Sequence, residues 1–286
     1  MSLLDINSLY LDIDQPILRG VSLQLMEGEV HGLVGESGAG KTMVGKCVLG
    51  LLPHRARLGH GYINFAGTEL LKLHGHERRE LLGRDITVIP QNPMTALNPV
   101  KRIEPQIIDV LQLHLEMSAI NAKRRALELM HDVHIREPEC VLQQFPHELS
   151  GGMRQRVLIA IAFACKPKLI IADEPTTALD VTVQRQILRL IKELQANSNT
   201  AILFITHDLG VVAKICNRVS VIHSGRILES NSATELFLAP KHAYTRALLA
   251  ATPRFDRPAA ALHPVPQELI AALWAEAKAH DETKTN

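Results

Sequence analysis

The sequence predicts an α/β fold built on a parallel sheet, and three observations carry the prediction. Residues 30–34 form an apolar run that ends in a glycine-rich loop, and apolar residues at helical spacing follow the loop. Residues 169–173 form a second apolar run, which ends at two carboxylates and a proline. Further strands are expected at 201–205 and 218–223. Continuous apolar runs of this kind are typical of strands covered on both faces, as in parallel sheets.

The glycine-rich loop matches the pattern G-x-x-x-x-G-K-[ST], which indicates a phosphate-binding loop when a strand precedes it and a helix follows it. Backbone N–H groups of such a loop point at a polyphosphate, and the helix N-terminus adds partial positive charge. We therefore predict that the loop binds a nucleoside triphosphate, with Lys41 at the β- and γ-phosphates and the Thr42 hydroxyl on Mg²⁺. The predicted binding residues are Gly35, Glu36, Ser37, Gly38, Ala39, Gly40, Lys41 and Thr42.

Composition narrows the class of protein. The 286 residues suffice for one large domain or two small ones, and a net charge of +1 is far from the basic balance of a nucleic-acid-binding domain. The 4 cysteines form no C-x-x-C pair, so they predict buried apolar residues and neither a zinc site nor disulfides. We find no signal-peptide pattern and no apolar run that could span a bilayer, and expect a soluble chain in a reducing compartment.

Apolar and polar residues alternate over residues 1–34, which predicts an antiparallel sheet of short strands ahead of the buried strand. Tyr10 lies in this region. Its ring could stack on an adenine, or it could be a half-buried strand residue without a role in binding, and the sequence leaves both interpretations open.

Residues 100–147 show helical periodicity, which predicts an all-helical insertion of about three helices. A predicted strand at 86–89 and a proline- and asparagine-rich loop at 92–99 precede it. Gln91, at the end of that strand, can point into a nucleotide site. After the insertion, Ser150-Gly151-Gly152 begins another helix, and this is either a second anion-binding site or a plain helix cap.

Two carboxylates and a histidine follow predicted strands. Asp173 and Glu174 lie at the carboxyl end of the strand 169–173, where open α/β sheets bind ligands. Because adjacent strand residues point in opposite directions, we assign them different roles: Asp173 holds Mg²⁺ and Glu174 polarises the attacking water. Asp180 lies in the turn before the next helix, and His207, after the strand 201–205, can bond a γ-phosphate or position water.

Together these motifs resemble the ATP-binding subunit of an ABC (ATP-binding cassette) transporter. They occur in the family's order: Walker A at 35–42, the Q-loop at Gln91, the signature at 149–155, Walker B at 169–174, the D-loop at 178–180 and the switch histidine at His207. The signature has Met153 where the commonest version has glutamine. The resemblance implies the ABC ATPase fold, a P-loop NTPase core with a parallel sheet, an N-terminal antiparallel β subdomain and an all-helical insertion at about residues 95–165.

The resemblance also implies a mechanism. Two such subunits meet head to tail, so that each ATP lies between the phosphate loop of one subunit and Ser150-Gly151-Gly152 of the other. Asp180 of the D-loop is a further nucleotide-binding residue that the resemblance implies. The catalytic residues that it implies are Glu174, His207 and Gln91. The implied Mg²⁺ ligands are Thr42, Gln91 and Asp173.

The partners implied by the resemblance are a second ATPase subunit, expected to be a paralogue, two transmembrane permease subunits and, indirectly, an extracytoplasmic solute-binding protein. No nucleic acid is expected. The chain is then a peripheral protein on the cytoplasmic face of the inner membrane.

The segments 91–99 and 239–249 are similar to the peptide and nickel uptake branch of the family. The short lead-in at 15–22 is closer to nickel-type subunits, so nickel or a metal chelate is the first expectation for the cargo, and di- or oligopeptides are the alternative. A soluble ABC ATPase acting on nucleic acid is less favoured, because the chain has no long coiled coil and no second cassette. We expect His74 and His76 to be exposed surface residues, since the cargo passes through the membrane subunits, and no cysteine follows Cys216 to support an iron–sulfur site.

The end of the chain differs from the ATPase domain, whose expected bounds are 1–252. Prolines within 253–266 predict a stiff linker, and an apolar stripe that contains Trp274 predicts a C-terminal helix, so 253–286 form a linker and helical tail. We expect the helix to pack on its own domain, with contact to a partner subunit as the alternative.

Overall fold

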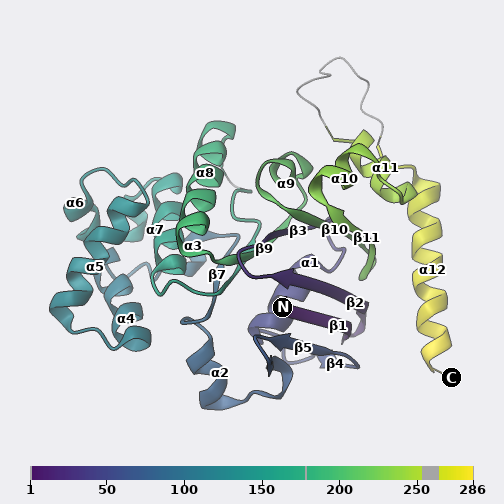
Figure 1. Ribbon diagram of the computed structural model, residues 1–286, viewed down its shortest axis with the longest axis horizontal. Helices are drawn as coiled ribbons and strands as arrows, with labels where there is room; N and C mark the ends of the chain where they lie inside the picture. The colour runs from purple at the N-terminus through teal and green to yellow at the C-terminus, as the bar shows by residue number, and fades with distance from the viewer. Residues whose placement is uncertain (1, 178, 253–263, 286) are drawn as a thin grey trace. The chain divides into compact units, whose positions relative to one another are not determined.

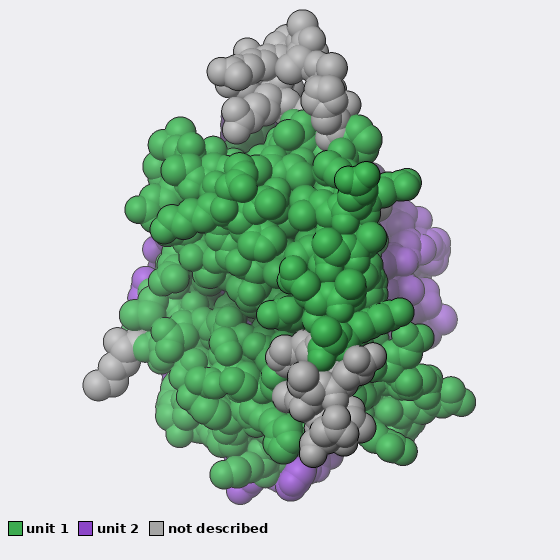
Figure 2. Space-filling view, turned by 90° about the vertical axis from the view of Figure 1, so that its right-hand side faces the viewer, with its two compact units in different colours: residues 1–73, 203–286 green, residues 74–202 purple. Residues whose placement is uncertain are grey.

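The computed structural model of the chain describes residues 2–177, 179–252 and 264–285 (Figure 1). It divides into two compact units, residues 1–73 with 203–286 and residues 74–202 (Figure 2). Each unit contains part of the predicted machinery: the phosphate loop and His207 lie in the first unit, and the signature and Walker B residues lie in the second.

The first unit begins with the predicted antiparallel sheet, whose strands follow the order β2-β1-β5-β6, with β4 paired to β1. The alternation of apolar and polar residues places Leu9 and Leu11 of β1 in the core. The expectation of short strands is wrong, because β1 and β2 have 12 residues each and the chain reverses between them at Asp14, where φ is 57°. The strands are β1 (Ser2–Ile13), β2 (Gln15–Met26), β4 (Arg57–Leu58), β5 (Tyr62–Phe65) and β6 (Thr68–Glu69).

Four strands that lie wholly or mostly in the first unit belong to the sheet that carries the phosphate loop, in the order β11-β10-β3-β9. β3 pairs in parallel with β10, and β10 pairs in antiparallel with β11. All residues of β3 and β9 are buried, as their continuous apolar runs predict. The strands are β3 (Val30–Val34), β9 (Ala201–Thr206), β10 (Arg218–His223) and β11 (Arg226–Ser232).

The described part of the first unit also contains six helices, of which α9 and α10 contact strands of this sheet and α12 contacts β2. The helix after the phosphate loop ends at Leu49, so the apolar residue Leu51 lies beyond it and is 61% exposed. A cluster of buried residues joins Val34 of β3 to residues of the C-terminal helices, among them Tyr244 and Leu273. The helices are α1 (Lys41–Leu49), η1 (Leu70–Lys72), α9 (Leu209–Ile215), α10 (Ala233–Leu238), α11 (Ala243–Ala250) and α12 (Gln267–Thr285).

The second unit contains the parallel pair β7 and β8 and the helical insertion. Three helices within 100–147 confirm the prediction for the insertion. The segment 92–99, expected to be a loop, contains a single helical turn, because the Asn92 side chain accepts a hydrogen bond from Met94 N and starts it. The elements are α2 (Gly75–Leu81), β7 (Ile86–Ile89), α3 (Pro93–Ala96), α4 (Ile103–Leu115), α5 (Ala119–Asp132), α6 (Pro138–Leu142), η2 (Pro146–Glu148), α7 (Gly151–Phe163), β8 (Leu169–Asp173) and α8 (Val181–Ser198).

Other expectations have mixed outcomes. His74 and His76 are exposed, as predicted. Cys47 is buried, Cys165 and Cys216 are partly buried, and Cys140 is exposed. The expectation that all four thiols lie in the core is therefore wrong for Cys140 and confirmed in full only for Cys47. Within the described residues, every helix is too short or too polar to pass through a bilayer.

The C-terminal helix α12 packs on the first unit, beside β2 (Figure 1). Leu273 and Ala277 of its apolar stripe are buried, whereas Trp274 is 46% exposed. The greater part of the predicted proline linker, residues 253–263, lies outside the described residues.

Candidate nucleotide site

The phosphate loop connects β3 to α1 in the first unit. Its last glycine, Gly40, has a φ of 103°, a conformation that residues with a side chain rarely adopt. A Cβ atom at Gly40 would lie 2.9 Å from Leu18 Cδ2 and 3.3 Å from the Ile17 carbonyl oxygen. The motif therefore needs glycine here for two reasons, the backbone conformation and the close approach of β2.

Lys41 lies at the first position of α1 and is 5% exposed. Its Nζ donates hydrogen bonds to the carbonyl oxygens of Gly35 at 2.8 Å and Glu36 at 2.9 Å, so the charge is held against the loop itself. The adjacent Thr42 is half-buried in the first turn of the helix. A cation, a hydroxyl and a helix N-terminus at one loop are the groups that bind a polyphosphate.

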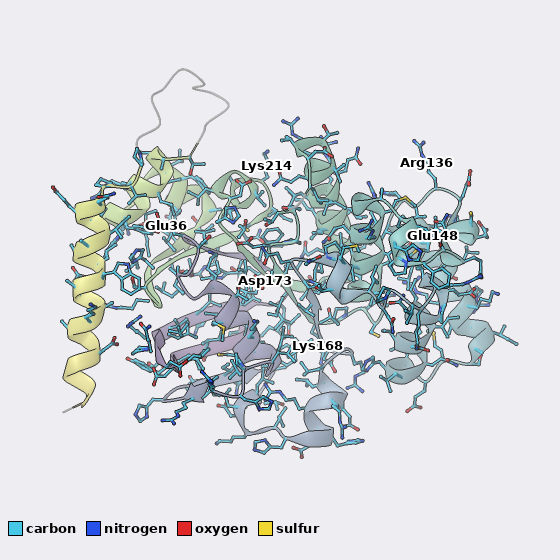
Figure 3. All side chains as sticks on the ribbon, turned by 180° about the vertical axis from the view of Figure 1, so that it is seen from behind. Glu36, Arg136, Glu148, Lys168, Asp173 and Lys214 are labelled. Carbon is cyan, nitrogen blue, oxygen red and sulfur yellow. The ribbon has the colours of Figure 1, made fainter. Side chains whose placement is uncertain are left out.

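The side chain of Glu36, which is labelled in Figure 3, interacts with residues outside the phosphate loop. Burial, with the negative charge of the Glu36 carboxylate, raises the pKa of Tyr244. The same carboxylate opposes the effect of burial on His223, whose pKa is lowered. The Glu36 side chain thus interacts with residues of β10 and α11.

Tyr10 and His207 complete the predicted residues of the first unit. A Cβ atom at Gly20 would lie 2.7 Å from the Tyr10 hydroxyl oxygen, so the half-buried ring lies over Gly20 of the neighbouring strand. His207 is exposed and follows β9. The next residue, Asp208, caps α9 by accepting from Gly210 N at 2.8 Å, which fixes the backbone at His207. Adenine stacking by Tyr10 and phosphate contact by His207 stay predictions.

In the second unit the structure brings Gln91 and Glu174 together. Gln91 Nε2 donates to Glu174 Oε2 at 3.0 Å, although the two residues are 83 positions apart. Asp173 is the last residue of β8 (Figure 3), whereas Glu174 has a φ of 46° and lies outside the strand. Our argument from strand alternation therefore does not hold for this pair, because a left-handed residue, and not the strand pleat, sets the direction of Glu174.

Sequence reasoning missed Thr177. Its hydroxyl donates to the same Glu174 oxygen at 2.9 Å, and its backbone N–H bonds the Glu174 carbonyl oxygen at 3.3 Å. Glu174 Oε2 therefore accepts from two side chains. The sequence feature that could have identified Thr177 is a hydroxyl residue three positions after the carboxylate, in a turn that follows Pro175.

Ser150 and Asp180 both cap helices within the chain. Ser150 Oγ accepts from Met153 N at 3.3 Å at the start of α7, and Asp180 Oδ1 accepts from the N–H groups of Thr182 and Val183 at 2.9 Å each at the start of α8. Of the D-loop, Ala178 lies outside the described residues. Gly151 is exposed, and a Cβ atom there would meet no heavy atom of the described residues within 4 Å. The second glycine, Gly152, would bring a Cβ atom 3.1 Å from Val183 Cγ1.

The predicted Mg²⁺ ligands offer a hydroxyl, an amide and a carboxylate oxygen, from Thr42, Gln91 and Asp173. Such oxygen donors suit Mg²⁺, which takes few protein ligands and completes its shell with phosphate and water. Within the part of the chain that the structure describes, no group of three or more His, Cys, Asp and Glu residues could hold a metal ion. The chemistry of these donors fits Mg²⁺, and binding of the metal by the three residues stays a prediction.

Comparison with known proteins agrees with this geometry. A family model described as "ABC transporter" matches residues 18–177, and one described as "AAA domain, putative AbiEii toxin, Type IV TA system" matches residues 143–213. The chain is 50% identical over 237 residues to a probable peptide ABC transporter ATP-binding protein of Sinorhizobium fredii, covering 82% of this chain and 71% of the relative. It is 48% identical over 240 residues to the oligopeptide transport ATP-binding protein OppD of Bacillus subtilis, covering 84% of this chain and 67% of the relative.

A solved structure extends the agreement to the fold. The dimeric ATP-binding cassette MJ0796, in a post-hydrolysis state bound to ADP and Pi, has a TM-score of 0.71 and 25% sequence identity, covering 80% of this chain and 98% of that one. The predicted ABC ATPase fold and ATP-hydrolysing activity are therefore confirmed. The chain belongs to the ABC transporter family, as one of its ATP-hydrolysing subunits.

Proposed function

We propose that this chain hydrolyses ATP to drive the uptake of di- or oligopeptides across the cytoplasmic membrane. The observation that carries the proposal is that relatives at 45–50% identity are named as peptide, oligopeptide and dipeptide transport proteins. These names favour the peptide alternative over nickel, our first expectation for the cargo. In this proposal two permease subunits form the path for the peptide, and the chain lies against them on the cytoplasmic side.

Glu174 is the proposed base for ATP hydrolysis. Gln91 and Thr177 each donate a hydrogen bond to its Oε2 atom, which restricts the carboxylate to one orientation. A carboxylate held in this way can accept a proton from water as the water attacks the γ-phosphate. Mg²⁺, held through Thr42, Gln91 and Asp173, would supply charge neutralisation at the phosphates.

The signature residues are proposed to bind the ATP of a second subunit. The support is the open space around Gly151, since no atom of the described residues within 4 Å requires a residue without a side chain there. A phosphate group that approaches the N-terminus of α7 would require it. The similar MJ0796 cassette is dimeric and bound to ADP and Pi. We propose a paralogue as the second subunit.

Transport by the assembled complex tests the proposal. The chain, a second ATPase subunit and the permeases are reconstituted in vesicles with the solute-binding protein, and uptake of a labelled dipeptide, a labelled tetrapeptide and labelled nickel is measured with ATP on the cytoplasmic side. We expect ATP-dependent uptake of peptide and none of nickel. A complex that contains Glu174→Gln is the control for ATP dependence. Uptake of nickel without peptide, or ATPase activity stimulated by DNA or RNA and not by permeases, would overturn the proposal.

A further inference from the structure

The C-terminal helix α12 reaches a buried arginine of β2. Arg19 is 7% exposed, and its Nε lies 2.9 Å and 3.0 Å from the two carboxylate oxygens of Asp281. The same guanidinium donates from Nη1 to the Ser224 carbonyl oxygen at 2.8 Å. One buried cation thus joins the tail of the chain to the turn between β10 and β11, in the first unit.

That turn is bonded to the phosphate loop. Gly225 N donates to the Ala39 carbonyl oxygen at 3.0 Å, and Gly225 O accepts from Arg19 N at 2.8 Å. A Cβ atom at Gly225 would lie 2.1 Å from the Ile17 carbonyl oxygen, so the turn lies directly on β2. The β2 residues Ile17 and Leu18 also contact Gly40. β2, the turn and the end of the phosphate loop are therefore in direct mutual contact.

A second set of contacts joins α12 to the same turn. The ring of His223, which is 5% exposed, lies edge-on to Trp274 of α12, with ring centroids 6.3 Å apart, and to Tyr244 of α11, with ring centroids 4.7 Å apart. Its Nδ1 is 2.9 Å from Ser224 Oγ. The turn is thus held by two groups of α12, an aromatic ring and a carboxylate.

We infer that Asp281 is a positioning residue for nucleotide binding, which acts through Arg19 and the turn 223–225 on the phosphate loop. Without the carboxylate, the Arg19 guanidinium is buried without its ion-pair partner, a state costly enough that the side chain must move. Movement of Arg19 releases the Ser224 carbonyl and weakens the contact of Gly225 with Ala39. The backbone N–H groups of the loop then lose their fixed orientation toward the phosphates, on which binding depends.

The test is the affinity of the full-length chain for a fluorescent ATP analogue with Mg²⁺, measured at 15 °C, together with the melting temperature without nucleotide. The variants are Asp281→Asn, Asp281→Glu, and Glu276→Gln as a control for an exposed carboxylate on the same helix. We expect Asp281→Asn to weaken binding about fivefold, the low end for coupling between separate sites. Asp281→Glu keeps the charge and should restore most of the affinity, and Glu276→Gln should bind as the wild type does.

The outcomes separate positioning from plain stabilisation. A lower melting temperature with unchanged ATP affinity in Asp281→Asn would mean that α12 only stabilises the unit, and the inference would be wrong. Equal weakening in Glu276→Gln and Asp281→Asn would also overturn it, because it would show a general charge effect. Failure of the wild type itself to bind the analogue would instead contradict the phosphate-loop assignment on which the inference rests. Peptide transport does not enter the measurement, so the cargo proposal is tested independently.

Discussion

His31 of β3 should make the stability of the protein depend on pH between about 4 and 6.5. The side chain is 1% exposed, and its Nε2 lies 2.8 Å from Ser220 Oγ. Burial, with the positive charge of Arg218, lowers the pKa of His31 from 6.5 to about 4. Because the folded-state pKa is the lower one, the unfolded chain binds the extra proton as the pH falls. The contribution to stability is therefore complete above pH 6.5 and is lost as the pH falls to about 4.

The magnitude follows from the two pKa values. At about 1.4 kcal/mol per pKa unit, the difference amounts to about 3 kcal/mol, of which about 2.5 kcal/mol is lost between pH 7 and pH 4.5. Urea unfolding, followed by circular dichroism at several pH values, measures it as the difference between the wild type and His31→Gln. His74→Gln, which removes an exposed histidine, is the control. If His31→Gln loses as much stability as the wild type over this range, His31 is not held neutral and the reasoning fails.

Three further variants test the site. Glu174→Gln should lower the rate of phosphate release at least about 100-fold and change ATP affinity less than about twofold. The substitution removes the base and replaces it with an amide of similar size. An unchanged rate of phosphate release would refute the role of Glu174. Ser150→Ala should cost only about 1 kcal/mol of stability but lower the ATPase rate of the assembled complex about tenfold or more. Ser118→Ala, which removes a similar cap at α5, should leave the rate intact. Equal ATPase rates in the two variants would mean that Ser150 is only a helix cap. Gly35→Ala places a Cβ atom 2.1 Å from the Ile222 carbonyl oxygen. We expect this overpacking to lower the free energy of unfolding by about 1–3 kcal/mol, which calorimetry would detect as a lower melting temperature. An unchanged melting temperature would show that the loop can move away from β10.

The order of elements could be predicted because each type leaves a local signal. The apolar runs of β3 and β8 predicted buried strands, and helical spacing predicted the three helices of the insertion. Boundaries depend on single residues whose effect is not periodic. A left-handed Asp14 joins two long strands where we expected short ones, and the Asn92 cap starts a helix inside an expected loop.

The site residues could be named from motifs, but their contacts could not. The hydrogen bond from Gln91 to Glu174 joins residues 83 positions apart, so only the tertiary fold determines it. The same holds for Arg19 and Asp281, which are 262 positions apart and match no motif. Sequence patterns report the backbone that a loop or helix requires, whereas side-chain pairs at this separation are set by packing.

The contacts of the segment 239–249 also explain why it is a poor guide to the cargo, although it carries the resemblance to the peptide and nickel branch. The Glu229 carboxylate accepts the backbone N–H groups of Lys241 at 2.8 Å and His242 at 2.9 Å, and His242 Nδ1 accepts from Tyr244 N at 3.1 Å. These bonds start α11 and place the Tyr244 ring against His223, in the turn that contacts the phosphate loop. The contacts of the segment thus lead to the turn beside the phosphate loop, and phosphate binding is a task common to importers of peptides and of metals. A motif with that task can be shared by subunits with different cargoes, so the cargo must be decided by transport measurements.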